Sequence, residues 1–376
     1  MNLEFSEEMN MLQDMLNKFL HNEYSFEQRQ TLSRQGIGYS EDNWQQFAEM
    51  GLLGVPFDEQ YGGFGFGQAG LIVVMEAIGK GLIVEPYLAS IVLAGQLVQQ
   101  AGSEAQKRTL LEPLIGGGLK LAFAYVERQS RYNLADVVCK AVKRGNQFCI
   151  RGSKSVVFNA ETADKIIVCV RTSGESISQA GISLFIVDKG SKGLSTRDYE
   201  TVDGLRASEV HFDGVMVDES SLIGELDNAY DAIQTVIDSA SAAICAEGVG
   251  VITQLRDKTV EYLKTRKQFG QPLSRFQVLQ HRCVDMFMHE EQMRSLAYLA
   301  AIKVTSDDAS ESAKSVSSAK VYLADARTIV AEQAAQLHGG IGVTDELDVA
   351  HYVKRLTMLN TLFGDRDFHL QRLCSL

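Results

Sequence analysis

The segment best equipped for chemistry is Tyr262–Gln277, which reads YLKTRKQFGQPLSRFQ. The loop in this segment carries three cations around an aromatic residue, Phe269, in a chain whose formal net charge is -12. The cations are Arg266, Lys267 and Arg275. A guanidinium can bind phosphate oxygens through two parallel hydrogen bonds and can stack on a planar group. The segment therefore predicts a site for a phosphorylated, planar ligand, and a solvated basic loop is the alternative.

The pattern on both sides places this segment between two long helices. Apolar residues recur at helical spacing over residues 229–265 and again over residues 276–304. Gly270 and Pro272 interrupt the pattern between them. Two further helices are expected over residues 312–336 and 349–360. Antiparallel helices of this length pack as a bundle, so we expect a helical bundle over residues 226–376.

The remaining chain predicts two other domains. Residues 1–119 show helical periodicity, with Ser6 as the cap of a first helix and further helices over 41–50, 70–78, 91–100 and 103–115. Over residues 120–225 the pattern changes to short runs of β-branched residues. The pair Gly145-Asn146 separates two such runs and predicts a hairpin. The chain is thus expected to be α+β and mainly helical, with a helical domain, a β domain and a helical bundle.

Composition excludes several classes of function. The acidic balance argues against a protein that binds nucleic acid or an anionic membrane. No stretch approaches the roughly 18 apolar residues of a membrane span, and the first residues lack the pattern of a secretory signal. A cytoplasmic location is therefore expected. The six cysteines lie far apart without histidine partners at metal-binding spacing, so we predict reduced thiols and no metal site.

The pattern R-x-x-F-G-x-P-x-x-x-F-Q from Arg266 to Gln277, followed by QLHGGIG at Gln336–Gly342, resembles the acyl-CoA dehydrogenase family of flavoproteins. The resemblance extends over nearly the whole chain. It implies the fold of that family, with an N-terminal helical domain, a middle β domain and a C-terminal four-helix bundle. It also implies FAD as cofactor, α,β-desaturation of an acyl-CoA substrate, and electron-transfer flavoprotein as acceptor.

The resemblance also implies which residues hold FAD. In the family these two motifs contact the adenosine pyrophosphate of FAD across a subunit interface. The residues carried over are Arg266, Gln268, Phe269, Gln277, Gln336, Gly339 and Gly340. The chemistry agrees, because a guanidinium suits pyrophosphate oxygens and glycines allow a ligand to approach the backbone closely.

The chain departs from the family at the two elements that meet the flavin ring. The first usually reads A-x-T-E-P-x-x-G-S-D, but here Val126 replaces the threonine and the glycine-serine pair is missing. The second usually reads K-x-W-I-T-N, but Lys154–Asn159 reads KSVVFN. Val156 thus replaces the tryptophan, and Phe158 replaces the threonine. Both changes remove groups that would contact the ring.

The chain departs again at the catalytic base. Desaturation needs a carboxylate that removes the α-proton, and the family places a glutamate in one of two positions. One position falls on Phe363, Gly364 or Asp365, and the other falls on Ala240. Neither holds a glutamate. Asp365 and Glu247 are the candidate substitutes, although a salt bridge is the alternative for each.

The pattern of retained and missing motifs favours one subunit type. The chain most resembles the small subunits of heteromeric bacterial acyl-CoA dehydrogenases, of the pimeloyl-CoA dehydrogenase type, and a large subunit is the expected partner. Two alternatives remain open. One is a self-sufficient dimer or tetramer that uses Asp365 or Glu247 as base, and the other is a non-catalytic assembly protein that keeps the fold.

Overall fold

The computed structural model describes residues 6–376, so the first five residues of the expected N-terminal domain lie outside the described part. The chain divides into two compact units. The first contains Leu32–Gly67 and Val84–Ala240. The second contains the described residues up to Thr31, Gln68–Ile83 and Ser241–Leu376. The boundaries of the three predicted domains stay a prediction.

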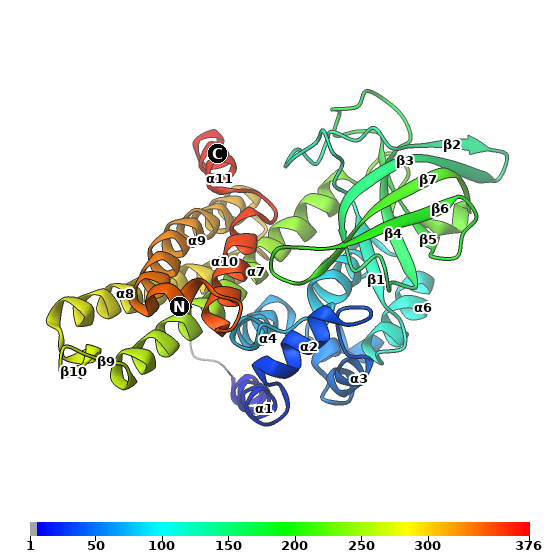
Figure 1. The fold of residues 1–376 in the computed structure, drawn as a ribbon. Helices are drawn as coiled ribbons and strands as arrows, with labels where there is room; N and C mark the ends of the chain where they lie inside the picture. The colour runs from blue at the N-terminus through cyan, green and yellow to red at the C-terminus, as the bar shows by residue number, and fades with distance from the viewer. Residues whose placement is uncertain (1–5) are drawn as a thin grey trace. The chain divides into compact units, whose positions relative to one another are not determined.

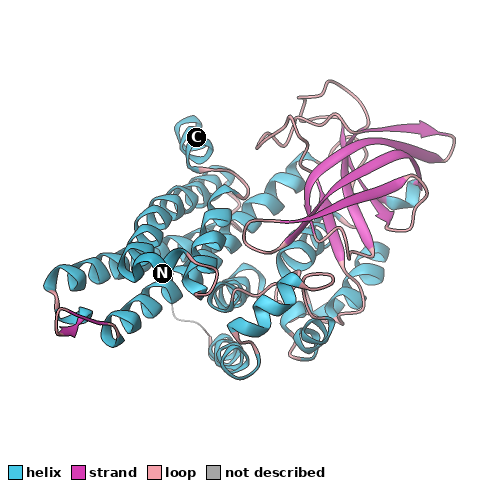
Figure 2. Cartoon of the chain, in the orientation of Figure 1, coloured by secondary structure: helices cyan, strands magenta, loops and turns pink. Residues whose placement is uncertain are grey.

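The first unit is built on a sheet of eight strands (Figures 1 and 2). The strands follow the order β6-β7-β3-β2-β4-β5-β8, and β1 pairs in parallel with β4. Their bounds are β1 Leu121–Ala124, β2 Lys140–Arg144, β3 Gln147–Phe158, β4 Lys165–Arg171, β5 Ile182–Asp188, β6 Leu194–Glu200, β7 Arg206–Asp218 and β8 Leu222–Ile223.

The sheet follows from the pattern of the sequence. The predicted hairpin is confirmed as β2–β3, with Gly145 at a positive φ of 63° in its turn. Strand β4 is buried almost throughout, and alternate residues of β3 and β7 join its core, where the rings of Phe148 and Phe185 lie 4.8 Å apart. A bulge between Lys154 and Val157 interrupts the pairing of β3 with β7, and it leaves Val156 in the left-handed region.

The first unit also holds the helices α3 (Glu41–Glu49), α5 (Gln96–Ala101) and α6 (Glu104–Ile115), and a π-helix over Leu88–Gly95 precedes α5. Side chains cap two of these helices. Ser40 accepts a hydrogen bond from the N–H of Asn43 at the start of α3, and Ser103 forms a capping box with Gln106 at the start of α6. Helix α2 (Phe26–Arg34), which the apolar pattern does not indicate, crosses the boundary between the units.

The second unit is helical. It contains α1 (Glu7–Glu23), α4 (Gly67–Gly81), α8 (Gln277–Lys303), α9 (Ala309–His338), α10 (Asp348–Thr361), α11 (Arg366–Ser375) and the larger part of α7 (Tyr230–Thr265). Helices α8 and α9 lie side by side, and α10 and α11 also pack on α9 (Figure 1). The predicted helical bundle is therefore confirmed. Ser6 caps α1 as predicted, by accepting from the N–H of Met9.

Helices α4 and α7 cross at close range because each places a glycine at the contact. A Cβ atom added to Gly79 would lie 2.1 Å from the carbonyl oxygen of Glu247, and one added to Gly250 would lie 2.0 Å from that of Glu76. Helix α7 is long and apolar enough to cross a membrane, but 94% of its most apolar window is buried, as in the core helix of a globular protein.

Candidate functional site

The two motifs expected to hold the cofactor lie next to one another in the helical unit. After α7, Lys267–Gln268 (β9) and Gln271–Pro272 (β10) form a short hairpin, which begins where the N–H of Arg266 donates to the carbonyl of Tyr262 at 2.8 Å. The ring of Tyr262 lies 4.5 Å from that of His338, centroid to centroid, at the end of α9. This ring contact places the hairpin motif beside Gln336–Gly340.

All seven residues of the predicted cofactor site are exposed in the chain. The ring of Phe269 is 88% exposed, on a residue held at a φ of 53°. Gly339 adopts φ 67° and ψ -149°, a conformation open in practice only to glycine. A Cβ atom added at Gly339 or Gly340 would meet no atom within 4 Å, so the space above this turn is free for a ligand.

The donor set here fits the adenosine pyrophosphate half of FAD. It offers one guanidinium, three side-chain amides and the backbone N–H groups of two adjacent glycines, none of them covered. Guanidinium and backbone N–H groups are the usual donors to phosphate oxygens. Side-chain amides can bind ribose hydroxyls or ring nitrogens. The assignment of these residues to FAD remains a proposal.

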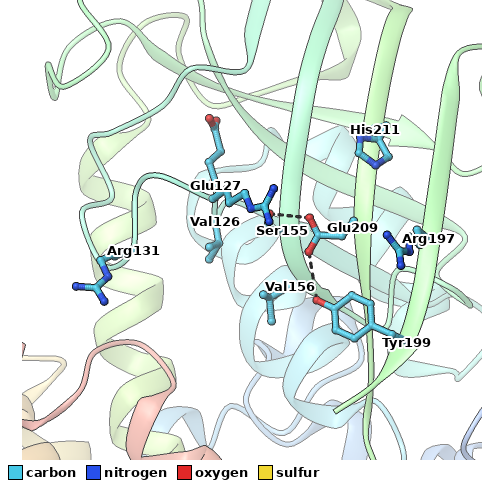
Figure 3. A pocket seen from close by; sticks show the side chains of 10 residues that line it. Val126, Glu127, Arg131, Ser155, Val156, Arg197, Tyr199, Glu209 and His211 are labelled. Atoms are coloured by element: carbon cyan, nitrogen blue, oxygen red, sulfur yellow. Dashed lines mark hydrogen bonds between the residues drawn. The ribbon is translucent and has the colours of Figure 1, made fainter.

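The two elements expected to meet the flavin ring border a pocket in the first unit (Figure 3). The pocket measures about 660 Å³, and Val126 and Val156 line it at the positions where the family has threonine and tryptophan. Glu209 lies in its wall and accepts hydrogen bonds from the hydroxyls of Ser155, at 2.8 Å, and Tyr199, at 3.4 Å. The missing indole and hydroxyl have no counterpart at these two positions, because both residues are valines.

A buried ion pair fixes the loop after β1 beside this pocket. The carboxylate of Glu127 accepts from Lys154 Nζ at 2.7 Å and from the N–H groups of Val138 and Cys139, each at 3.0 Å. Burial alone would raise the pKa of Glu127, but the charge and hydrogen bond of Lys154 hold that pKa below its usual value. Glu127 is therefore an ionised anchor that ties the loop to β3.

Two of the residues at the positions of the family's glutamate, Ala240 and Gly364, cannot supply a base. Ala240 is buried on α7 and has no ionisable group. Gly364 lies between α10 and α11 at a φ of 123°, and a Cβ atom added there would lie 2.4 Å from the ring of Phe368 and 2.6 Å from Nε2 of His369. The loop therefore has no room for a side chain at Gly364.

The two candidate substitutes are both engaged in structural contacts. Glu247 is buried, and its two carboxylate oxygens accept from Nε and Nη2 of Arg355, at 2.5 and 2.9 Å. Asp365 is half-buried and caps α11, because its Oδ1 accepts from the N–H of Phe368 at 2.9 Å. The neighbouring Arg366 pairs with Asp325 and not with Asp365. The base assignments of Glu247 and Asp365 stay predictions that these contacts disfavour.

A buried lysine, which the sequence pattern did not indicate, holds the loop between α10 and α11. Lys320 on α9 donates from Nζ to the carbonyl oxygens of Leu359 and Leu362, at 2.8 and 2.7 Å. Burial lowers the pKa of Lys320 to about 8, although the thiol of Cys245 and the carboxylate of Asp365 oppose this shift. Lys320 thus anchors the C-terminal end of α10.

Comparison with known proteins decides the family. The models of the acyl-CoA dehydrogenase N-terminal, middle and C-terminal domains match residues 6–118, 122–215 and 230–374. Mitochondrial isovaleryl-CoA dehydrogenase of Oryza sativa subsp. japonica is 30% identical over 309 residues, which cover 81% of this chain and 75% of that protein. The chain belongs to the acyl-CoA dehydrogenase family. Members of this family are oxidoreductases that act on CH–CH bonds and bind FAD.

Two further acyl-CoA dehydrogenases match nearly the whole chain. The probable acyl-CoA dehydrogenase YngJ of Bacillus subtilis is 29% identical, over 99% of this chain and 98% of that protein. The solved structure of a variant of the Tcur3481-Tcur3483 steroid ACAD superposes with a TM-score of 0.87 and 28% identity, over 98% of this chain and 97% of that one. The FAD and the CH–CH oxidoreductase class predicted from the resemblance are therefore confirmed at the level of the family.

Sequence reasoning missed one group of residues at the pocket. Arg128, Arg131 and Arg197 line it, and they come from the loop after β1 and from β6. The sequence signal for the first two is the stretch Glu127–Tyr132, which reads ERQSRY. The third lies in a different strand, so only the pairing of β6 with β7 brings it to this face.

Proposed function

We propose that this chain is the small subunit of a heteromeric acyl-CoA dehydrogenase that desaturates an acyl-CoA thioester between its α and β carbons. In this proposal the chain contributes the site for the adenosine pyrophosphate half of an FAD whose flavin ring is held by a complementary large subunit. FAD, when bound, accepts the hydride from the β carbon. The carboxylate that removes the α-proton comes from the large subunit.

The observation that carries the proposal is the contact between Glu247 and Arg355. A general base must have a free oxygen within reach of the proton that it removes. Both oxygens of Glu247 are bound by a buried guanidinium instead. Of the residues at the positions where the family has its glutamate, Ala240 has no ionisable group, and Gly364 has no room for a side chain.

Two further observations support a split site. The seven residues proposed for FAD, from Arg266 to Gly340, are all exposed in the single chain and can therefore reach a cofactor that another subunit holds. Two positions that would contact the flavin ring within this chain are Val126 and Val156, whose side chains offer no hydrogen bond. The Tcur3481-Tcur3483 steroid ACAD, whose name pairs two proteins, is similar to this chain along almost its full length.

One observation favours a second candidate, a homo-oligomeric enzyme with Asp365 as base. Asp365 is half-buried in the loop expected to carry the base, and its helix cap uses only one of its two oxygens. Its side chain is one carbon shorter than glutamate, and it is fixed toward the N–H of Phe368. We therefore rank this candidate below the heteromeric enzyme.

The electron acceptor belongs to the same proposal. A reduced FAD must pass two electrons to an acceptor, and we infer electron-transfer flavoprotein from the resemblance to the family.

The test is co-expression of this chain with candidate large subunits that retain the tryptophan and the glutamate. We expect a complex with bound FAD and acyl-CoA dehydrogenase activity, and we expect that Arg266→Gln in this chain lowers its FAD content. A complex that keeps its full FAD content with Arg266→Gln would overturn the proposed role of this surface. Full turnover by the isolated chain would overturn the need for a partner.

A further inference from the structure

A buried histidine of α10 is fixed between an arginine and a carbonyl group in the helical unit. Nδ1 of His351 lies 3.1 Å from Nη1 of Arg29 on α2, and Nε2 lies 3.2 Å from the carbonyl oxygen of Asp345. A guanidinium only donates hydrogen bonds, and a carbonyl oxygen only accepts them. Nδ1 must therefore accept and Nε2 must donate. The two contacts together require the neutral imidazole with its proton on Nε2.

The second contact holds the segment that follows the glycines proposed for FAD. Asp345 follows Gly340 by five residues, in the link between the 3-10 helix Gly339–Val343 and α10. Its carbonyl oxygen also accepts from Nε2 of Gln30 at 3.2 Å, and its carboxylate accepts from Nζ of Lys354 at 2.7 Å. Side chains of α2 and α10 thus meet at Asp345. A fixed Asp345 limits the backbone conformations that are open to the glycines before it.

We propose that His351, together with Arg29, positions Gly339 and Gly340 for FAD, and that it does so only while its imidazole is neutral. The inference rests on the proposed FAD surface and adds two positioning residues outside its motifs. A proton on Nδ1 would point an N–H at the guanidinium and bring two positive charges together. The contact between α2 and α10 would then break, and Asp345 would lose the donor that His351 provides.

The surroundings of His351 oppose its protonation. Within residues 6–376 the charged groups that face the ring are Arg29 from α2, Asp345 from the preceding link and Lys354 from α10 itself. Burial is the main cause that lowers the pKa of His351, and Arg29 and Lys354 lower it further, while Asp345 opposes them. The unfolded histidine therefore binds a proton more readily than the folded one. The hold on Asp345 should weaken as pH falls below 6.5, the ordinary pKa of histidine.

The test is hydrogen exchange of the complete isolated chain, measured by mass spectrometry at about pH 7.5 and about pH 5.5, with the intrinsic exchange rate divided out. The protection of residues 339–347 should fall by about five- to tenfold at the lower pH. This is the factor by which a histidine of ordinary pKa favours an opened form over this interval. His351→Gln offers one acceptor and one donor but does not titrate, so its protection should stay nearly the same.

A matched control makes the exchange result specific. His21→Gln removes an exposed histidine of α1 and should keep the full loss of protection in acid. His338 is present in all three chains, so the difference between them belongs to His351. His351→Asn repeats the test with a shorter amide in case His351→Gln does not fold. Equal protection of the unsubstituted chain at both pH values would overturn the proposal, and so would an equal loss in His351→Gln.

A second measurement joins this contact to the cofactor. In a complex with a large subunit, the FAD content should fall in acid by a larger factor with the unsubstituted chain than with His351→Gln. If Arg266→Gln lowers the FAD content but both complexes lose FAD equally in acid, the FAD surface stands and the positioning role of His351 is overturned. If Arg266→Gln leaves the FAD content unchanged, the FAD surface itself is wrong, and the positioning role falls with it.

Discussion

Glu247 and Arg355, which lie 108 residues apart in the chain, form a buried ion pair in which Nε and Nη2 of the arginine bind the two carboxylate oxygens at 2.5 and 2.9 Å. The pair joins α7 to α10 inside the helical unit. A buried carboxylate bound through both oxygens to one guanidinium is a structural contact, because its charge is balanced by that guanidinium and its oxygens are shielded from a substrate. Glu247 is therefore an anchor of the bundle.

This role predicts a large effect of Glu247 on stability. Replacement of Glu247 by Ala should destabilise the chain by about 3 to 5 kcal/mol, because the buried charge of Arg355 then loses the carboxylate that balances it. The double variant Glu247→Leu with Arg355→Met should recover much of this loss. Thermal unfolding followed by circular dichroism measures both. Glu261→Ala, at an exposed position of the same helix, is the matched control and should change the unfolding midpoint little.

Asp365 should act as a helix cap and not as a base. Asp365→Ala removes the acceptor for the N–H of Phe368 and should cost about 1 kcal/mol of stability. Asp365→Asn keeps the cap, because asparagine is an equally good N-cap residue. In a complex with a large subunit, both variants should retain turnover. If Asp365→Asn folds normally but abolishes turnover, Asp365 is the base. That result would favour the homo-oligomeric enzyme over the heteromeric one.

Lys320 predicts a pH dependence of stability. Burial lowers its pKa to about 8 in the folded chain, while an unfolded lysine titrates near 10.5. Between these two pH values the unfolded chain binds more protons than the folded chain. The unfavourable contribution of Lys320 to the free energy of unfolding is therefore largest below pH 8, and it falls as pH rises toward 10.5. The difference in unfolding midpoint between the unsubstituted chain and Lys320→Met should change in favour of the unsubstituted chain across this window. Lys314→Met, at an exposed position of α9, should show no such change.

The exposed surface near Arg266 should control flavin content. Arg266→Gln in this chain should weaken FAD binding by the assembled enzyme about 10- to 100-fold, through loss of a charge-assisted hydrogen bond. Gly339→Ala should also lower the FAD content, because alanine is strained at the backbone angles of Gly339. Lys314→Gln, at an exposed position of α9 outside both motifs, should leave the content nearly unchanged. Flavin absorbance per complex after gel filtration measures all three.

Local signals in the sequence predicted helices, strands and turns. Contacts between residues far apart in the chain could not be predicted in this way. The hairpin at Gly145 and the cap at Ser6 follow from neighbouring residues, and the structure confirms both. The partner of Glu247 lies 108 residues away, so no local pattern names Arg355. Helix α11 was not predicted from the sequence.

At the candidate sites, too, local motifs could be predicted from the sequence, but residues brought together by the fold could not. The motifs around Arg266 and Gly339 were found from their sequence pattern, and the contact of Tyr262 with His338 explains how two separate motifs form one surface. The cationic pocket was not predicted. Its arginines lie on two elements, and only the register of β6 against β7 brings Arg197 to the face that holds Glu209.

The most direct test of a split FAD site is the absorbance spectrum of the purified chain, before and after addition of an equimolar large subunit. We predict that the chain alone lacks stable flavin bands. The mixture with added FAD should acquire them and should bleach on addition of an acyl-CoA substrate. A chain that retains FAD alone and bleaches with acyl-CoA at full amplitude would contradict the account, because it would contain a complete site.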